Sequence, residues 1–271
     1  MSSQVARRRP DPLGKLVYGL VLAYLAGLLL VPLVALVATV AAHAGEVVTQ
    51  LLEGRALHAL AMSLAIGAAC VASHAVFGTA AALVLVRHRF PGRRILDAVV
   101  DLPLALSPVM TGLAFLLLYG RSGVLRPLTD ALGFQVAFAW PGVLLATLFV
   151  TLPFTVREVA LVLSELGDSE EQAAATLGAS PLRTFFRVTL PNIRHGLVVG
   201  STLTLARALG EFGAVLVVGG SIANRTATAT TFIHGAVEER HEPAAFGMAL
   251  LLAGAAVALL MVLARTGRRQ R

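Results

Sequence analysis

The chain alternates between long apolar runs and short polar connections. Six runs cover residues 16–42, 59–86, 96–119, 139–157, 197–220 and 244–264. Each is close to the roughly 20 helical residues that cross a hydrocarbon core about 30 Å thick. Because lipid offers no hydrogen bonds to the backbone, each run is predicted to be a helix. The pattern therefore predicts an all-α integral membrane protein with six transmembrane helices.

The composition agrees with this pattern. Charged residues make up 14% of the 271 residues and hydrophobic residues 57%, whereas soluble domains carry about 25% charged residues. The single cysteine, Cys70, lies inside an apolar run, which excludes a disulfide framework. The histidines are scattered without ligand spacing, so no metal site is predicted.

Basic residues are distributed unevenly, so the net charge of +7 is interpreted as a topology signal rather than as a nucleic-acid surface. Arg207 lies inside the fifth run, and the loops on one side of the membrane hold Arg55, Arg121, Arg126, Arg225 and Arg240. All others lie on the opposite side: Arg7, Arg8, Arg9, Lys15, Arg87, Arg89, Arg93, Arg94, Arg157, Arg183, Arg187, Arg194, Arg265, Arg268, Arg269 and Arg271. Because cytoplasmic loops carry the excess of Lys and Arg, both termini and residues 165–191 are predicted to be cytoplasmic.

Residues 165–191, here called the polar segment, interrupt an otherwise apolar sequence. Ser169 is predicted to cap a helix, with Gln172 completing a capping box. Glu170 and Glu171 follow at positions where the helix dipole favours negative charge. Gly178 is predicted to end this helix in a left-handed conformation.

A second short helix is predicted to follow at once. Ser180 is placed to cap it and Pro181 to occupy its first turn. Pro191 is predicted to stop it at about Leu190. Two interpretations remain open for the resulting bent pair of helices. It packs as a surface hairpin on the ends of the membrane helices, or its exposed alanines and aromatics bind a partner protein.

The spacing within the polar segment resembles a known motif. QAAATLG, nine residues and then VTLP resemble the EAA loop of ABC importer permeases, with Gln172 in place of Glu and Val188 in place of Ile. In that family the loop is the coupling helix that docks on an ATPase subunit. The resemblance implies a coupling role for Glu171, Gln172, Ala173, Ala174, Gly178, Ala179, Phe185, Val188, Leu190 and Pro191.

Three further stretches, 101–120, 149–159 and 206–220, resemble the sulfate permease branch of the family, in its CysW-like form. The resemblance implies a type I ABC importer permease fold and a non-catalytic subunit that passes sulfate or thiosulfate across a bacterial inner membrane. Permeases for molybdate and tungstate are near relatives, and these anions remain alternatives.

The resemblance also implies partners. Two ATPase subunits binding ATP and Mg²⁺, a second permease subunit (identical or a sister) and a periplasmic binding protein are expected, besides membrane lipid. No cofactor is expected on the chain itself, which carries no GxxxxGK[ST] phosphate loop. The core permease domain is placed at 57–264. Residues 1–56 form the tail, first helix and first loop, and 265–271 a basic tail. The first run, too long for a signal-peptide core, is expected to be retained.

Charged residues inside the membrane form a second candidate site. Arg207 and Glu211 are four residues apart and extend a polar stripe from Gly200 and Thr204. A charge at the bilayer centre costs about 2.5–3.5 kcal/mol, so these groups should face protein or a water-filled path. A structural ion pair and an anion gate are both compatible with the pattern. The candidate path residues are Asp101, Ser107, Thr204, Arg207 and Glu211.

Two further expectations concern this path. Asp97 and Asp101 are predicted as partners of Arg207. Ser107-Pro108 and Pro153 are predicted to kink the third and fourth membrane helices. A secondary anion transporter would share such features, but inverted repeats are not visible in the sequence. A membrane enzyme would need a polar cluster of catalytic groups, which the sequence lacks.

Overall fold

The computed structural model describes residues 12–268, and every regular element in that range is helical. In chain order these elements are α1 (Pro12–Ala42), α2 (Ala44–Leu51), α3 (Gly54–Ser73), η1 (His74–Gly78), α4 (Thr79–Arg87), α5 (Arg93–Ala105), α6 (Pro108–Tyr119), α7 (Arg126–Ala131), α8 (Trp140–Leu166), α9 (Ser169–Thr176), α10 (Pro181–Thr184), η2 (Phe185–Thr189), α11 (Leu190–Leu209), α12 (Gly213–Gly219), α13 (Ala229–Glu238) and α14 (Glu242–Arg268). The two η elements are π-helical turns. Five of the basic residues from which the topology was predicted, at positions 7–9, 269 and 271, lie outside the described residues.

All six predicted membrane regions are helical. Four are continuous spans by length and apolarity, at Leu13–Ala42, Gly54–Arg87, Trp140–Leu166 and Glu242–Leu263. The other two are bent pairs of helices: α5 with α6 at 113°, and the continuous stretch from α10 to α11 with α12 at 57°. The expected kink at Ser107-Pro108 is thus a complete break, whereas α8 runs unbroken through Pro153.

The break between α5 and α6 follows from its sequence. Ser107 has an extended backbone, and its hydroxyl accepts a hydrogen bond from the N–H of Met110 at 3.3 Å. Pro108 then occupies the first turn of α6, where its missing N–H is not needed. A capping serine followed by proline therefore starts a new helix rather than bending an existing one.

The central helix of the bundle is α8, which extends to residue 166 rather than ending at the predicted residue 157. Val156, Val159 and Leu163 continue its buried face against α4 and α11. Arg157 lies within this helix, and two aspartates of α5 bind its guanidinium.

Glycines let α11 approach α8 closely. A Cβ at Gly196 would lie 2.8 Å from the carbonyl oxygen of Glu158, and one at Gly200 would lie 2.8 Å from the Cα of Thr155. Small residues at these two positions therefore permit the close contact between α11 and α8.

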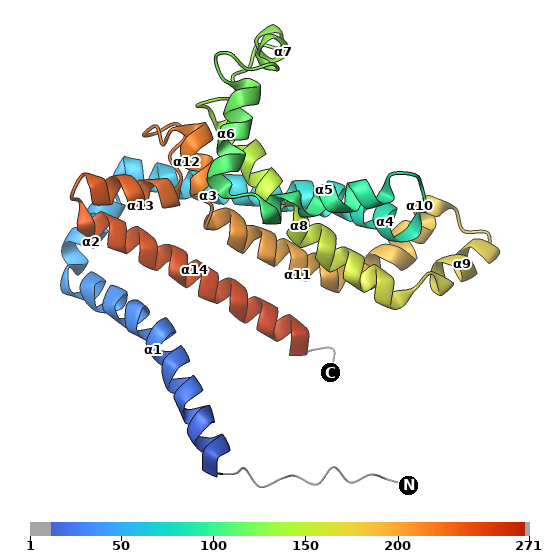
Figure 1. Cartoon of the computed structure of the whole chain (residues 1–271), viewed down its shortest axis with the longest axis horizontal. Helices are drawn as coiled ribbons and strands as arrows, with labels where there is room; N and C mark the ends of the chain where they lie inside the picture. The colour runs from blue at the N-terminus through green and yellow to red at the C-terminus, as the bar shows by residue number, and fades with distance from the viewer. Residues whose placement is uncertain (1–11, 269–271) are drawn as a thin grey trace.

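The polar segment lies at one end of the bundle. Figure 1 shows α9 and α10 at that end, α2 and α13 at the opposite end, and α6 and α7 projecting from the side. The first helix, α1, diverges from the bundle, and none of the residues in its most apolar window is buried inside the chain. Its surface is therefore open to lipid or to another subunit.

Candidate functional site

The first helix of the polar segment starts one residue earlier than predicted. Asp168 occupies the N-cap position, no side chain caps the helix, and Ser169 is its first residue. The predicted capping box is therefore wrong. The two glutamates at the start of α9 explain the difference, because contacts with the membrane helices, rather than a local cap, hold this end.

The end of α9 follows the prediction. Gly178 has φ +78°. Its N–H donates to Ala175 O, and the N–H of Ala179 donates to Ala174 O, each at 3.0 Å. These two bonds form a Schellman motif. Ser180 then caps the next helix, as expected, by accepting a hydrogen bond from the N–H of Arg183.

The second helix does not stop at Leu190 as predicted. It continues from Pro181 to Leu209, through the π-helical turn η2. In that turn the N–H of Leu190 donates to Phe185 O, five residues back. The wider turn places Pro191 in the first turn of α11, where a proline ring is tolerated. The second helix of the polar segment is therefore continuous with the fifth membrane helix.

The polar segment exposes apolar side chains at its bend. Leu177 is 88% exposed, Leu182 69% and Phe186 58%, and Phe186 packs edge-on against Phe185 at 5.1 Å between ring centroids. These apolar side chains are exposed on a segment that is otherwise largely polar. Of the predicted coupling residues, Gln172, Ala173, Gly178 and Pro191 are exposed, and Glu171, Ala174, Ala179, Phe185, Val188 and Leu190 are partly buried. Leu177, directly before the helix-ending glycine, was missed.

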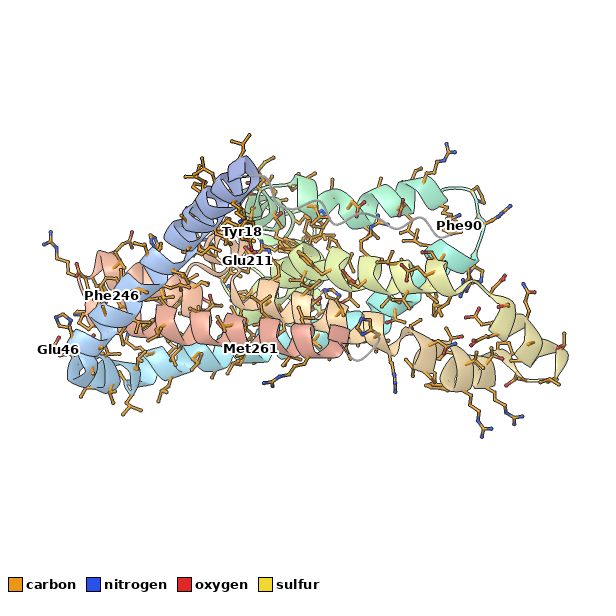
Figure 2. All side chains as sticks on the ribbon, turned by 90° about the horizontal axis from the view of Figure 1, so that it is seen from below. Tyr18, Glu46, Phe90, Glu211, Phe246 and Met261 are labelled. Atoms are coloured by element: carbon orange, nitrogen blue, oxygen red, sulfur yellow. The ribbon has the colours of Figure 1, made fainter. Side chains whose placement is uncertain are left out.

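Glu171 does not face the exposed surface but is held by Arg87, the last residue of α4. Arg87 Nε lies 3.0 Å from Glu171 Oε2, and its other nitrogens donate to Leu163 O at 3.1 Å and to Gly167 O. Thr189 donates its hydroxyl to Glu171 Oε1 at 2.9 Å. We call these five residues the Arg87 cluster. In Figure 2 the labelled Phe90, three residues beyond Arg87, shows toward which end of the molecule this cluster lies.

Sequence reasoning missed this cluster. Arg87 was used only as a topology signal, and its partners are 76 to 84 residues away along the chain. A related bond joins Glu170 to the side-chain amide of Asn192. The sequence signal that was available is the pair of glutamates in the first turn of α9, which require positive partners if they are not solvated.

Asp97 and Asp101 do not bind Arg207, so that prediction is wrong. Both bind Arg157 of α8, at 2.7 Å and 2.6 Å. The aspartates are four residues apart on α5 and so share a helix face beside α8. Arg157 therefore links the third and fourth membrane helices, and Asp101 lies in this cluster.

Arg207 binds Glu211 instead, at 2.7 Å. The Glu211 side chain is only 1% exposed, and its Oε1 accepts a hydrogen bond from the N–H of Ala214 at 2.9 Å. Glu211 lies beyond the end of α11, at the break before α12, so the predicted polar stripe does not continue on one helix. Thr204 is buried and bonded to Thr155 rather than open to a path. Figure 2 shows Glu211 near the middle of the molecule's length.

The two broken membrane regions meet at their breaks. A Cβ on Gly213, the first residue of α12, would lie 3.1 Å from Pro108 Cβ. Further along, a Cβ on Gly112 of α6 would lie 2.7 Å from Val217 Cβ and 2.9 Å from Ala214 O. The structure thus brings Ser107 and Glu211, far apart in the sequence, to one region where two interrupted helices contact each other.

Comparison with known proteins identifies this architecture. Residues 74–268 match the model of the family described as "Binding-protein-dependent transport system inner membrane component". The chain belongs to this family. It is a multi-pass membrane protein of the ABC permease type.

Relatives of this permease include proteins described as "Sulfate transport system permease protein CysW". The one from Synechococcus elongatus is 46% identical over 79% of this chain and 76% of its own length. The one from Synechocystis is 45% identical over 91% of this chain and 90% of its own length. An Escherichia coli protein of the same description is 43% identical over 76% of this chain and 71% of its own length.

Among solved structures, a bacterial ABC transporter involved in the import of the acidic polysaccharide alginate is similar to this permease. The TM-score is 0.73 with 17% identity, over 94% of both chains. A second structure of an alginate transporter, in complex with a periplasmic protein, gives a TM-score of 0.72 over the same share of each chain. These similarities show that the fold is that of an ABC importer permease.

Proposed function

We propose that this permease is the membrane subunit of an ATP-driven importer that carries sulfate or thiosulfate across the bacterial inner membrane. The observation that carries the proposal is the polar segment. Its exposed apolar bend combines with the family's spacing from Gln172 through Gly178 to Pro191. The names of relatives that are 43–46% identical support the choice of anion.

In this proposal the chain is not itself an enzyme. Two ATPase subunits hold ATP and Mg²⁺ and bind the polar segment, and a periplasmic binding protein delivers the anion. A second permease subunit completes the path. The polar segment and both termini face the cytoplasm, which agrees with the distribution of basic residues.

The path is proposed to run beside the two breaks. Ser107 caps α6 at one break, and the Arg207–Glu211 pair spans the other. The Glu211 carboxylate already accepts a hydrogen bond from the backbone at the start of α12. We therefore propose that the Arg207–Glu211 pair stabilises the break as part of a gate and does not itself bind the transported anion. Thr204 and Asp101 fix the neighbouring helices through Thr155 and Arg157.

The test is reconstitution of the permease in proteoliposomes with its candidate ATPase, sister permease and binding protein. ATP-dependent uptake of sulfate that requires every subunit is expected, with molybdate as the competing anion. The variant Gly178→Asp, which strains the bend of the polar segment, is expected to reduce ATPase binding. Anion transport by the permease without any ATPase would contradict the proposal, and preferential molybdate uptake would reassign the substrate.

A further inference from the structure

The Arg87 cluster connects the polar segment to three membrane helices at once. Arg87 ends α4, Leu163 and Gly167 lie at and just beyond the last turn of α8, and Glu171 lies in α9. Through Thr189 the cluster also reaches η2, which continues into α11. The side chains of Arg87 and Glu171 are only 17% and 23% exposed, so this is not a solvated surface pair.

The chemistry of the guanidinium suits this position. The last carbonyls of α8 have no intrahelical donors and carry the negative end of its dipole. Glu171 adds a full negative charge from the first turn of α9. A planar fork with five N–H donors can bond two carbonyls and a carboxylate together, which the compact ammonium of lysine cannot reproduce.

The backbone on either side of α9 makes this connection necessary. Gly167 has φ +66° and Gly178 has φ +78°, and nothing lies within 4 Å of where a Cβ would stand on either. Two permissive residues in open space therefore flank an eight-residue helix none of whose residues is buried. Local structure alone leaves α9 free to swing about both ends.

The packing at the cluster opposes such a swing. The cavity among Arg87, Leu163, Glu171, Thr189 and their neighbours measures about 10 Å³, room for one water at most. The neighbouring bond between Glu170 and Asn192 ties α9 directly to α11. Moving α9 away from the membrane helices therefore requires breaking several charge-assisted hydrogen bonds together.

We propose that Arg87 is the positioning residue that makes α9 move as one body with α4, α8 and the start of α11. A force applied to the polar segment then reaches the membrane helices instead of being lost in the two glycine hinges. This inference rests on the proposed function, since the force is that of an ATPase partner.

The experiment uses the complete importer in proteoliposomes and measures sulfate uptake and ATP hydrolysis on the same sample. Arg87→Gln removes the charge and most of the fork. Arg89→Gln is the matched control, because Arg89 lies two residues away, is exposed and has no ion pair among the described residues. Arg87→Lys keeps the charge without the fork.

Arg87→Gln is expected to assemble with the ATPase within twofold of wild type and to keep basal ATP hydrolysis. Its sulfate uptake per ATP hydrolysed is expected to fall at least tenfold, with Arg87→Lys closer to Arg87→Gln than to wild type and Arg89→Gln unchanged. An unchanged uptake-to-hydrolysis ratio in Arg87→Gln overturns the proposal. A loss of uptake that merely follows a loss of assembled complex overturns it too.

A second measurement needs no partner. Cleavage by a glutamate-specific protease after Glu170, which is exposed in α9, is followed in the purified permease. Faster cleavage in Arg87→Gln than in Arg89→Gln supports the cluster as the restraint on α9, and equal rates overturn it. If the wild-type permease neither binds an ATPase nor takes up sulfate, the proposed function fails, while the proteolysis result still decides whether Arg87 restrains α9.

Discussion

One continuous helical stretch, Pro181–Leu209, has an arginine–glutamate pair near each end. At the polar segment, Glu171 is paired with Arg87 and is 23% exposed. At the opposite end, Glu211 is paired with Arg207 and is 1% exposed. The two pairs have the same chemistry, but their partners differ. Arg87 joins three elements distant in sequence, whereas Arg207 binds a residue four positions away.

The difference separates two uses of an ion pair. A fully buried carboxylate without a positive partner destabilises the fold. The Arg207 pair is therefore needed to stabilise the break between α11 and α12. The Arg207 side chain itself is 31% exposed, so the buried member of that pair is Glu211 alone. In the Arg87 pair both side chains are partly exposed, so losing it leaves no fully buried carboxylate and costs less stability. Its importance lies in which elements it connects. The buried pair should therefore control stability and the half-buried pair should control motion.

The largest effect is expected at the buried end. Arg207→Ala leaves the Glu211 carboxylate in the interior with one backbone donor, which should destabilise the fold by about 3–5 kcal/mol. Thermal unfolding of the detergent-purified permease measures this. The double variant Arg207→Gln/Glu211→Gln should recover most of the stability while uptake stays low. If the free energy of unfolding of Arg207→Ala lies within about 1 kcal/mol of the wild-type value, the two pairs do not differ in their contribution to stability.

The next largest effect is expected where α6 contacts α12, the two helices that follow the breaks. Gly112→Ala places a Cβ 2.7 Å from Val217 Cβ and 2.9 Å from Ala214 O, and a backbone atom cannot yield as a side chain does. A loss of about 1–3 kcal/mol is expected, as for other overpacked contacts. Gly254→Ala, with nothing within 4 Å, is the control and should be neutral or slightly stabilising. Equal melting temperatures for both variants would mean that the two breaks do not depend on this contact.

A smaller effect is expected at the bend of the polar segment. Gly178→Ala forces a side chain into the left-handed region, at a cost of about 1–2 kcal/mol, although the added methyl meets no neighbour. Because this part of the segment is exposed, ATPase binding should weaken more than global stability. Titration of the ATPase against the reconstituted permease measures it, with Gly235→Ala as the control. Unchanged binding would remove the bend from the docking surface.

The smallest effect is expected from Thr189→Val. This change deletes one hydroxyl that donates to Glu171 and keeps the side-chain shape, so about 0.5–1.5 kcal/mol is at stake. Sulfate uptake per ATP hydrolysed is expected to fall a fewfold, less than in Arg87→Gln. A larger fall than in Arg87→Gln would mean that the bond from η2, rather than Arg87, is the main restraint on α9.

Several features of the fold could be predicted because their causes are local. Apolar run length located the four continuous spans and both bent helix pairs, and Gly178 and Ser180 marked helix ends that depend only on neighbouring backbone atoms. Pro191 shows the limit of such rules. A proline usually ends a helix, but here the π-helical turn before it lets the helix continue, and that turn has no local signature.

The charged residues show the same limit. Arg157, Asp97 and Asp101 were all visible in the sequence, but the aspartates were assigned to the wrong arginine. Four-residue spacing correctly suggested that Arg207 faces Glu211, because that partner is local. Partners on different helices depend on how the helices are packed and rotated, which the order of residues does not reveal.

The sequence by itself determined that this chain is helical and spans a membrane, where its polar segment lies, and which family it resembles. These properties follow from apolar run length, capping chemistry and spacing, all of which act over a few residues. Only the tertiary structure decided that the two broken membrane regions meet, and that Arg87 holds the polar segment to three helices. The physical reason is that both features depend on contacts between residues distant in the chain, whose geometry is set by packing.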